Sequence, residues 1–154
     1  WHINDTALLI GDAAHATVPF YGQGMNAGFE DITVLNELIE KYGDDWHTIF
    51  NEYEASRKPN TDAIAELSYR NFVEMSSKTA DENFLLRKKI EKHFSDKHPE
   101  KWMPLYSRVT FSEHPYSEAL RVGDFMDEIM KMENIKEKWD SEEIENAILE
   151  KLSK

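Results

Sequence analysis

Apolar residues near the N-terminus change from a continuous run to a helical spacing. Residues 7–10 are all apolar and precede Gly11 and Asp12, which predicts a short buried strand that ends at a glycine and a carboxylate. From Met25 onward the apolar residues recur in steps of three and four, which predicts a helix ending near Tyr42 and Gly43. One face of this helix carries Met25, Phe29, Ile32, Leu35, Leu38, Ile39 and Tyr42.

The same reading predicts helices over most of the remaining chain. Asp44 or Asp45 can cap a helix that Pro59 ends, and Pro59 can begin the next helix, which we expect to reach Lys78. Further helices are expected over residues 81–98, over 116–132, and after Asp140 or Ser141. The fold class expected for this chain is therefore mostly α, with one short N-terminal strand.

Two of these segments carry more detailed expectations. In the helix over residues 81–98, the inward side chains should be Phe84, Leu85, Ile90 and Phe94, and the outward ones Arg87, Lys88, Lys89, Glu91 and Lys92. Residues 99–115 contain Pro at both ends and at position 104, together with many aromatic residues. We expect this segment to be a buried extended loop or short strand, because the helical pattern breaks there.

Composition narrows the kinds of partner. The chain has 154 residues, a net charge of −12, a pI near 4.9 and no cysteine. An acidic surface repels phosphate, which argues against nucleic acid and anionic membranes as partners. The absence of cysteine excludes disulfides and Cys-ligated metal sites and is compatible with the cytoplasm, and no apolar run is long enough to span a bilayer.

The first residues raise a question about the rest of the sheet. The chain begins at Trp1 and enters the expected strand almost at once, and no other segment of the sequence predicts a partner strand. A lone strand cannot satisfy its backbone hydrogen-bonding groups. We therefore expect this chain to be the C-terminal part of a longer protein whose N-terminal sheet it would join.

Candidate chemistry is concentrated around the strand end and the following helix start. Asp12 would lie at the carboxyl end of a strand, where ligands bind in open α/β sheets, and could hold a hydroxyl or ribose-like group. Gly22 and Gly24 precede the helix at Met25, where unpaired backbone amides and the helix dipole attract an anionic or electron-rich group. The alternative is a plain glycine turn. A dinucleotide phosphate loop is rejected, because the glycines do not follow the strand directly.

The stretch as a whole resembles a known family. Residues 11–15 (Gly-Asp-Ala-Ala-His), Pro19, and residues 22–26 (Gly-Gln-Gly-Met-Asn) are similar to the second flavin-binding signature of the FAD-dependent aromatic hydroxylases. The fuller run over residues 19–31 and the segment 106–111 resemble the members that hydroxylate L-kynurenine. The resemblance implies that this chain is the C-terminal part of an α/β, Rossmann-like FAD-binding monooxygenase. Residues 1–42 would end the FAD-binding domain, and residues 43–154 would form a helical region lining the substrate pocket.

The resemblance also implies roles for individual residues. FAD would be bound by Gly11, Asp12, Pro19, Gly22, Gln23, Gly24, Met25 and Asn26. The aromatic substrate would contact Phe20, Tyr21, Asn71 and Tyr106. From the residues alone, Asn71 could equally be a buried amide satisfied by the protein, and Tyr106 a core tyrosine with a satisfied hydroxyl. Tyr21 departs from family members that carry His at this position.

Other catalytic arrangements have less support. Asp12 and His15 could suggest a metal pair, but no further ligands gather at a consistent spacing, and His15 is better interpreted as orienting the turn. No Gly-x-Ser-x-Gly elbow supports a serine hydrolase. We expect no metal site.

The function expected from the resemblance is an NADPH-using hydroxylation of L-kynurenine to its 3-hydroxy product through a flavin hydroperoxide. The missing amino-terminal part would bind the substrate carboxylate, so this chain alone is expected to be inactive. Animal relatives carry a C-terminal membrane anchor, whereas this chain ends in Leu-Ser-Lys, so we expect it to depart from that pattern and to be soluble. The alternatives are hydroxylation of another aromatic acid, or a non-catalytic acidic helical interaction module.

Overall fold

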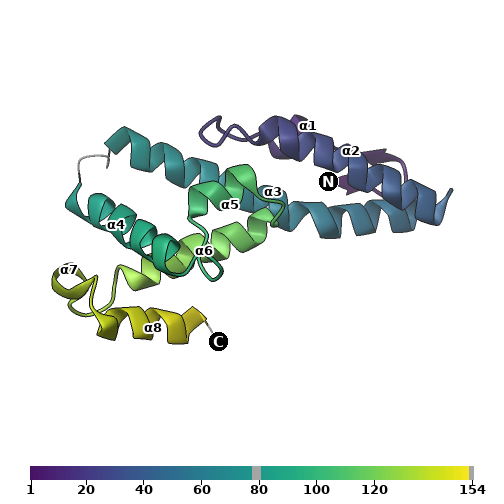
Figure 1. Ribbon diagram of the computed structural model, residues 1–154. Helices are drawn as coiled ribbons and strands as arrows, with labels where there is room; N and C mark the ends of the chain where they lie inside the picture. The colour runs from purple at the N-terminus through teal and green to yellow at the C-terminus, as the bar shows by residue number, and fades with distance from the viewer. Residues whose placement is uncertain (78–80, 153–154) are drawn as a thin grey trace. The chain divides into compact units, whose positions relative to one another are not determined.

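The computed structural model describes residues 1–77 and 81–152, which are mostly helical (Figure 1). Contacts divide the chain into two units. Unit 1 consists of Trp1–Phe72 and His114–Leu120, and unit 2 consists of Val73–Glu113 and Arg121–Lys154. The helices are α1 (Asp12–His15), α2 (Gly24–Tyr42), α3 (Trp46–Ser77), α4 (Glu82–Lys97), α5 (Leu105–Phe111), α6 (Tyr116–Ile129), α7 (Ile135–Lys138) and α8 (Glu142–Leu152).

The strand expected over residues 7–10 is shorter and more exposed than the sequence predicted. Strand β2 (Ala7–Leu8) pairs antiparallel with β1 (His2–Ile3), so that His2 lies opposite Leu8. Leu9 is half exposed, and its amide donates to the carbonyl of Trp1 at 2.9 Å. The prediction of a buried strand without a partner in this chain is therefore wrong, because a tight turn brings the first residues back as the partner.

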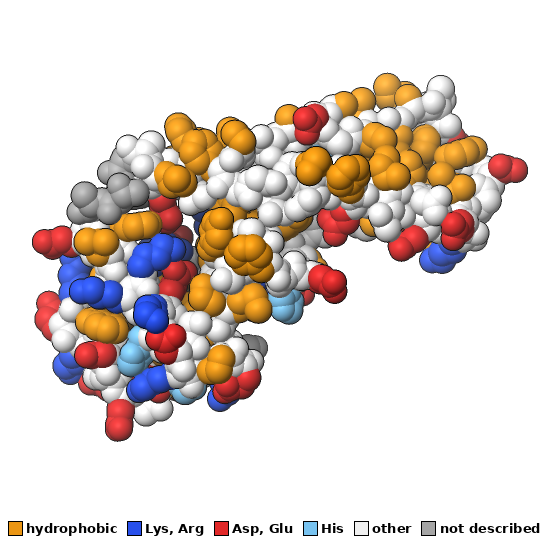
Figure 2. Space-filling model, turned by 45° about the horizontal axis from the view of Figure 1, so that its top comes forward, with side chains coloured by type: hydrophobic (Ala, Val, Ile, Leu, Met, Phe, Trp, Pro, Cys, Tyr) orange, Lys and Arg blue, Asp and Glu red, His pale blue; other side chains and the backbone are white. Residues whose placement is uncertain are grey.

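Helix α2 occupies the residues that its apolar spacing predicted, and it ends at Gly43, whose φ of 61° is a conformation that favours glycine. The side of α2 that packs inward is narrow and carries Ala27 and Asp31. Met25, Phe29 and Ile32 of the apolar stripe are instead 71%, 65% and 52% exposed. Figure 2 shows hydrophobic side chains gathered on this part of the surface.

Helix α3 is continuous through Pro59, so the prediction that Pro59 ends one helix and begins another is wrong. Proline has no amide to donate to the carbonyl of Ala55, which normally makes it a helix breaker. Two side chains just beyond it donate to neighbouring carbonyls: Asn60 Nδ2 to Ser56 O at 3.3 Å and Thr61 Oγ1 to Arg57 O at 3.2 Å. Neither bond replaces the one lost at the Ala55 carbonyl, and the continuous helix agrees with the burial of Arg57 and Thr61 on both sides of Pro59. Its expected end at Lys78 lies outside the described residues.

The N-terminus of α3 and its inward face match the predicted pattern. The Asp45 carboxylate accepts from the Thr48 amide at 3.1 Å, which is the expected capping contact. Ile49, Tyr53, Ile64 and Leu67 are at most 1% exposed and form the apolar interior of unit 1. The spacing of the sequence predicts one face with Trp46, Ile49, Phe50 and Tyr53 and then Ile64, Leu67, Asn71 and Met75. This face is buried from Ile49 to Leu67, whereas Trp46 and Met75 at its two ends are 39% and 58% exposed.

Unit 2 has a continuous hydrophobic core, which consists of Ile90, Phe94, Trp102, Met126, Ile129, Ile135, Ile144 and Ile148. Two of its helices begin as predicted. The Asp81 carboxylate accepts from the amides of Asn83 and Phe84 at the start of α4, and Ser141 Oγ accepts from the Ile144 amide at the start of α8.

Three details of unit 2 differ from the expectations. Leu85, expected inward, is 49% exposed, and Glu91, expected outward, is 4% exposed beside Lys88. Arg87 is also partly buried, where it pairs with Asp127. The prediction of the buried face of α4 was partly wrong, because a charged side chain can lie on a buried helix face when it has an oppositely charged partner.

The segment expected to be an extended loop or short strand contains helix α5. Pro104 is its N-cap, and the carbonyl of Pro104 accepts from the Arg108 amide at 2.9 Å. A proline is compatible with a helix start because no amide is needed there. Aromatic density obscured the helical spacing, and the expectation of burial holds only in part, since Trp102 and Val109 are buried while Phe111 is 77% exposed.

Candidate functional site

The turn that precedes α1 presents the first two residues expected to bind a cofactor. Gly11 adopts φ 58° and ψ −142°, a conformation that a residue with a side chain rarely adopts. A Cβ atom at Gly11 would meet no other atom within 4 Å, so the space beside the turn is open. Asp12 follows as the first residue of α1, and its side chain is exposed. The turn therefore leaves the Asp12 carboxylate accessible to a ligand.

The start of α2 has the features of an anion-attracting helix terminus. Gln23 is the N-cap residue, but its side chain makes no capping hydrogen bond, and the first turn contains no acidic residue. The first amides of the helix are therefore not capped by the side chain of the N-cap residue, and the positive end of the helix dipole is not offset by a carboxylate of that turn. Gly22, at φ 68°, leaves open space beside it, as Gly11 does.

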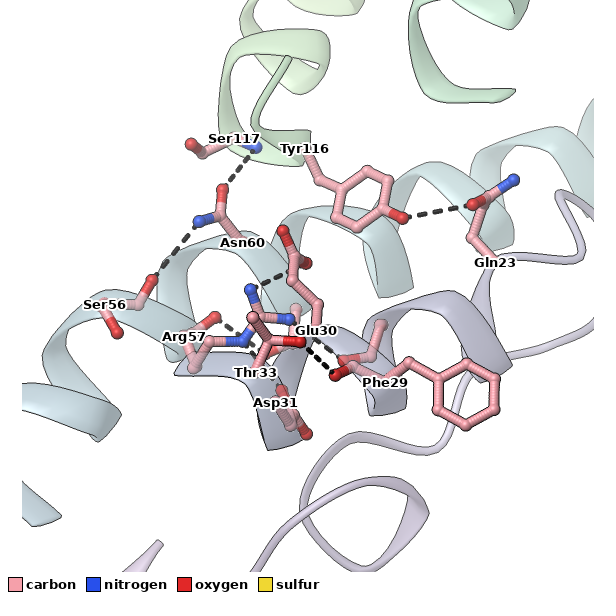
Figure 3. Close-up of polar contacts among 12 residues, drawn as sticks. Gln23, Phe29, Glu30, Asp31, Thr33, Ser56, Arg57, Asn60, Tyr116 and Ser117 are labelled. Atoms are coloured by element: carbon pink, nitrogen blue, oxygen red, sulfur yellow. Dashed lines mark hydrogen bonds and ion pairs between the residues drawn. The ribbon is translucent and has the colours of Figure 1, made fainter. Parts of the chain in front are cut away.

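The side chain of Gln23 binds two other side chains and not the amides of its own helix terminus. Its Oε1 accepts from Asn26 Nδ2 at 2.8 Å and from the Tyr116 hydroxyl at 3.2 Å, and only 7% of the residue is exposed (Figure 3). Gln23 therefore fixes the loop to α6 within unit 1, and any contact it makes with a cofactor would come from its backbone. Pro19 and Met25 are exposed on the same stretch.

The residues expected to contact the substrate are placed together only in part. Asn71 Nδ2 donates to the carbonyl of Phe20 at 2.9 Å, and the Phe20 ring lies 4.8 Å from the ring of Phe72. Tyr21 follows directly and is half-buried. The Asn71 Nδ2 donor is thus bound to the protein backbone, and this bond fixes the loop of residues 16–23 to α3. The contact of Asn71 with a substrate stays a prediction.

Tyr106 lies in unit 2, so its place in a common wall with the other three residues stays a prediction. It is 51% exposed on α5, and its ring lies 6.2 Å from that of Phe111. It borders a cavity of about 360 Å³ that is also lined by Lys88, Glu91, Lys92, Ser95, Asp96 and Pro104. The charged lining differs from the apolar surroundings that the aromatic-rich sequence suggested.

A buried carboxylate that the sequence analysis missed lies between these segments. Asp31 is fully buried, and its Oδ2 accepts from the Gly11 amide at 2.9 Å and lies 2.5 Å from His15 Nε2. Its Oδ1 accepts from Arg57 Nε at 2.8 Å. His15 therefore orients the turn, as expected, and it does so through Asp31.

Arg57 completes this cluster from α3. Its Nη1 pairs with Glu30 Oε2 at 2.7 Å, and its Nη2 donates to the carbonyl of Ala27 at 3.2 Å (Figure 3). We use the term clamp for the buried group Asp31, His15 and Arg57 with the Gly11 amide. One signal in the sequence could have found it: Arg57 falls on the apolar face of its helix, where a charge needs a buried partner.

The electrostatics of the clamp favour charged Asp31 and Arg57. Burial raises the pKa of Asp31, but hydrogen bonds from His15, Arg57 and Gly11 outweigh it and hold the pKa below its ordinary value. Burial likewise opposes the charge on Arg57, yet Asp31 and Glu30 raise its pKa. Burial, followed by the negative charge of Asp31, raises the pKa of the neighbouring Tyr53 hydroxyl. The clamp is therefore an ionic structure inside unit 1.

Two further properties bear on the kinds of site expected. Over residues 1–77 and 81–152, no three His, Asp or Glu side chains are placed to hold a metal ion. Within the same ranges, no helix is both long and apolar enough to cross a membrane.

Comparisons with known proteins show similarity over the whole chain. Residues 2–68 match the model of an FAD binding domain. The chain is 70% identical to a protein of Flavobacterium johnsoniae named kynurenine 3-monooxygenase, with 100% of this chain and 35% of the relative covered. The similarly named protein of Flavobacterium psychrophilum is 66% identical over 99% of this chain and 35% of its own length. One of Anopheles gambiae is 45% identical over 84% of this chain and 27% of its own length. The chain thus spans about a third of the length of these two Flavobacterium relatives.

Proposed function

Because this chain belongs to the family of the kynurenine 3-monooxygenases, we propose that it forms part of an FAD-dependent aromatic hydroxylase. The proposed reaction uses NADPH and oxygen to convert L-kynurenine to 3-hydroxykynurenine. The observation that carries the proposal is the start of α2, where helix amides without a side-chain cap follow a glycine loop inside the stretch that matches an FAD binding domain. We further propose that the chain completes a Rossmann-like fold in a longer protein, with its own boundary after residue 42.

The residues present fit an FAD molecule at two places. The exposed Asp12 carboxylate would lie at the ribityl and pyrophosphate region and accept hydrogen bonds from ribityl hydroxyls, beside the open turn at Gly11. The loop from Pro19 to Gly22 and the backbone of Gln23 would lie along the flavin ring. The amides of Gly24, Met25 and Asn26 would lie near its pyrimidine side, where a helix terminus stabilises negative charge.

The chemistry of oxygen activation would be supplied by bound FAD after reduction by NADPH. This chain would orient the cofactor and the aromatic ring to be oxidised. Phe20 and Tyr21 would face the substrate ring, with the Asn71 carbonyl oxygen and the Tyr106 hydroxyl at its edge. Because Asn71 already donates to Phe20, a change at Asn71 would act on the loop as well as on the substrate. The cytoplasmic location also stays a prediction.

The proposal is tested on the full-length protein that contains this chain. We expect it to bind FAD and to consume NADPH and oxygen when L-kynurenine is added, with 3-hydroxykynurenine as the product. A panel of other aromatic acids distinguishes the alternative substrate class. A protein that binds no flavin would refute the cofactor, and efficient hydroxylation of a different acid would refute the substrate.

A matched pair of variants tests the cofactor site itself. Asp12→Ala should weaken FAD binding by about 10- to 100-fold, because a hydrogen bond to a charged group is lost. Asp44→Ala removes an exposed carboxylate from the turn after α2 and should leave FAD affinity unchanged. Equal affinities in the two variants would remove Asp12 from the site.

A further inference from the structure

The clamp connects both segments that we propose to contact FAD, although its ionic groups are buried. We propose that Asp31 and Arg57 are positioning residues that set the distance and orientation between the Gly11–Asp12 turn and the N-terminus of α2, and thereby control FAD affinity and the properties of the bound flavin. This inference rests on the proposed function and gives a role to Asp31, the last residue of the run that resembles the family, and to Arg57, which lies outside that run.

Asp31 holds the turn before α1 and the end of α1. The Gly11 amide donates to Asp31 Oδ2, and His15 Nε2 binds the same oxygen from the other end of α1. One carboxylate oxygen therefore holds both ends of a four-residue helix. Because Asp12 lies between these two anchors, the direction of its exposed carboxylate depends on the position of Asp31.

Asp31 and Arg57 also fix the position of α2. Asp31 is itself a residue of α2, two turns after the Gly24 amide, and an α-helix is rigid over so short a distance. Arg57 binds Asp31 Oδ1 through Nε and the Ala27 carbonyl through Nη2, so one guanidinium holds two successive turns of α2 against α3. A displacement of Asp31 therefore displaces the helix terminus.

Burial keeps the Asp31 carboxylate and the Arg57 guanidinium from direct contact with a ligand. Asp31 is fully buried, and the side chain of Arg57 is only 3% exposed, so neither ionic group can reach a cofactor. Both act through the backbone atoms they hold. A buried ionic network is directional and tolerates few alternative geometries, which suits the role of fixing two backbone segments. The pairing of Arg57 with Glu30 differs, because Glu30 is 51% exposed and is replaceable by water.

The test measures FAD binding and flavin properties in the full-length protein. Asp31→Asn keeps the shape of the side chain and removes its charge. We expect FAD affinity to fall on the order of tenfold, as for coupling through residues that do not touch the ligand, and the visible absorption bands and midpoint potential of the bound flavin to shift. Arg57→Lys keeps the charge but cannot hold Asp31 and Ala27 at once, and it should show a smaller change in the same direction.

Two controls separate positioning from general destabilisation. Asp62→Asn removes a carboxylate from the exposed Lys58–Asp62 pair on α3 and should change neither affinity nor spectrum. Glu30→Gln should have a smaller effect than either clamp variant. If Asp31→Asn does not fold, the Arg57→Lys protein decides the question.

Three outcomes are distinguished. If the clamp variants only lower the melting temperature and leave flavin affinity, spectrum and potential unchanged, the inference is overturned and the clamp is purely structural. If the unmodified protein binds no FAD, the proposed function fails first. If the clamp variants change the flavin properties while Asp62→Asn does not, positioning is supported.

Discussion

The two units of this chain are stabilised in different ways. Unit 2 buries a continuous cluster of apolar side chains from several helices, and Glu145, which is 14% exposed, pairs with the more exposed Lys97 and His98. Unit 1 also has apolar residues along α3, but at its centre lie Asp31 and Arg57, while Met25 and Phe29 are exposed on α2. The inward face of α2 is thus partly ionic and part of its outward face is apolar, the reverse of an ordinary surface helix.

The difference indicates where each unit tolerates change. Apolar packing is non-directional, and a core of hydrophobic residues adapts to a substitution of similar volume. A buried ion pair depends on both partners and on geometry, because an unpaired buried charge is strongly destabilising. We expect unit 2 to respond to the volume of its core residues and unit 1 to the charge of its clamp.

The largest expected effect is in the clamp. Arg57→Ala leaves the buried Asp31 without its cation and should lower the free energy of unfolding by about 3–5 kcal/mol. Urea denaturation of the full-length protein measures it. Arg70→Ala, on the same helix, removes an arginine that pairs with Glu66 near the surface and should cost at most about 1 kcal/mol. Similar losses in the two variants would contradict the role of burial.

The corresponding change in the apolar core is a loss of volume. Ile148 is fully buried in α8, and Ile148→Ala should lower the free energy of unfolding by about 2–5 kcal/mol through lost transfer energy and a cavity. Ile148→Leu preserves the volume and should cost less than about 1.5 kcal/mol. A leucine variant as unstable as the alanine variant would show that shape, rather than volume, governs this core.

Acid should destabilise both units, with different responses to salt. Hydrogen bonds from Lys97 and His98 lower the pKa of Glu145 from 4.5 to about 2, so its stabilisation is present above pH 4.5 and is lost as the pH falls toward 2. The lowered pKa of Asp31 has the same sign, so its contribution is lost as the pH falls through the folded-state pKa. Unfolding free energy measured against pH should therefore decline below about pH 4.5.

Salt and a variant separate these two contributions. Exposed pairs are screened by salt, whereas buried ones are screened much less. High salt, or Glu145→Gln, should flatten the part of the decline that belongs to unit 2 and leave the part that belongs to Asp31. A decline that high salt abolished entirely would place the acid sensitivity at the surface alone.

The smallest effect is expected on the exposed face of α2. Phe29 is 65% exposed, and Phe29→Ser should change the unfolding free energy by no more than about 0.5 kcal/mol if that face makes no contacts elsewhere in the protein. Phe94→Ala in the unit 2 core, by contrast, should cost about 3–5 kcal/mol. A loss at Phe29 of similar size would show that the face is covered in the full-length protein.

Much of the helical structure could be predicted from local signals. The spacing of apolar residues placed α2, and the carboxylate of Asp81 and hydroxyl of Ser141 marked the starts of α4 and α8. These signals are contained within a few residues, so no tertiary information was needed. The predictions at Pro59 and in the segment containing α5 were wrong, because α3 is buried on both sides of Pro59 and continues through it, and Pro104 takes the N-cap position of α5.

The candidate site was predictable only where its residues are adjacent in sequence. The Gly11–Asp12 turn and the glycine loop form a continuous motif, and the open start of α2 agrees with it. The clamp could not be found this way, since Asp31 and Arg57 lie on different helices and their pairing depends on how these pack. Asn71 illustrates the intermediate case, in which the residue was identified but its bond to the Phe20 carbonyl was not.

Pro59 has a further consequence for heat tolerance. A proline in a helix interior is less favourable than alanine by roughly 3 kcal/mol, and here Pro59 gives the Ala55 carbonyl no backbone donor. Pro59 is exposed. A substitution in the middle of α3 is thus where a thermophilic or engineered version of this protein could raise its melting temperature most without changing a residue proposed to contact FAD or substrate.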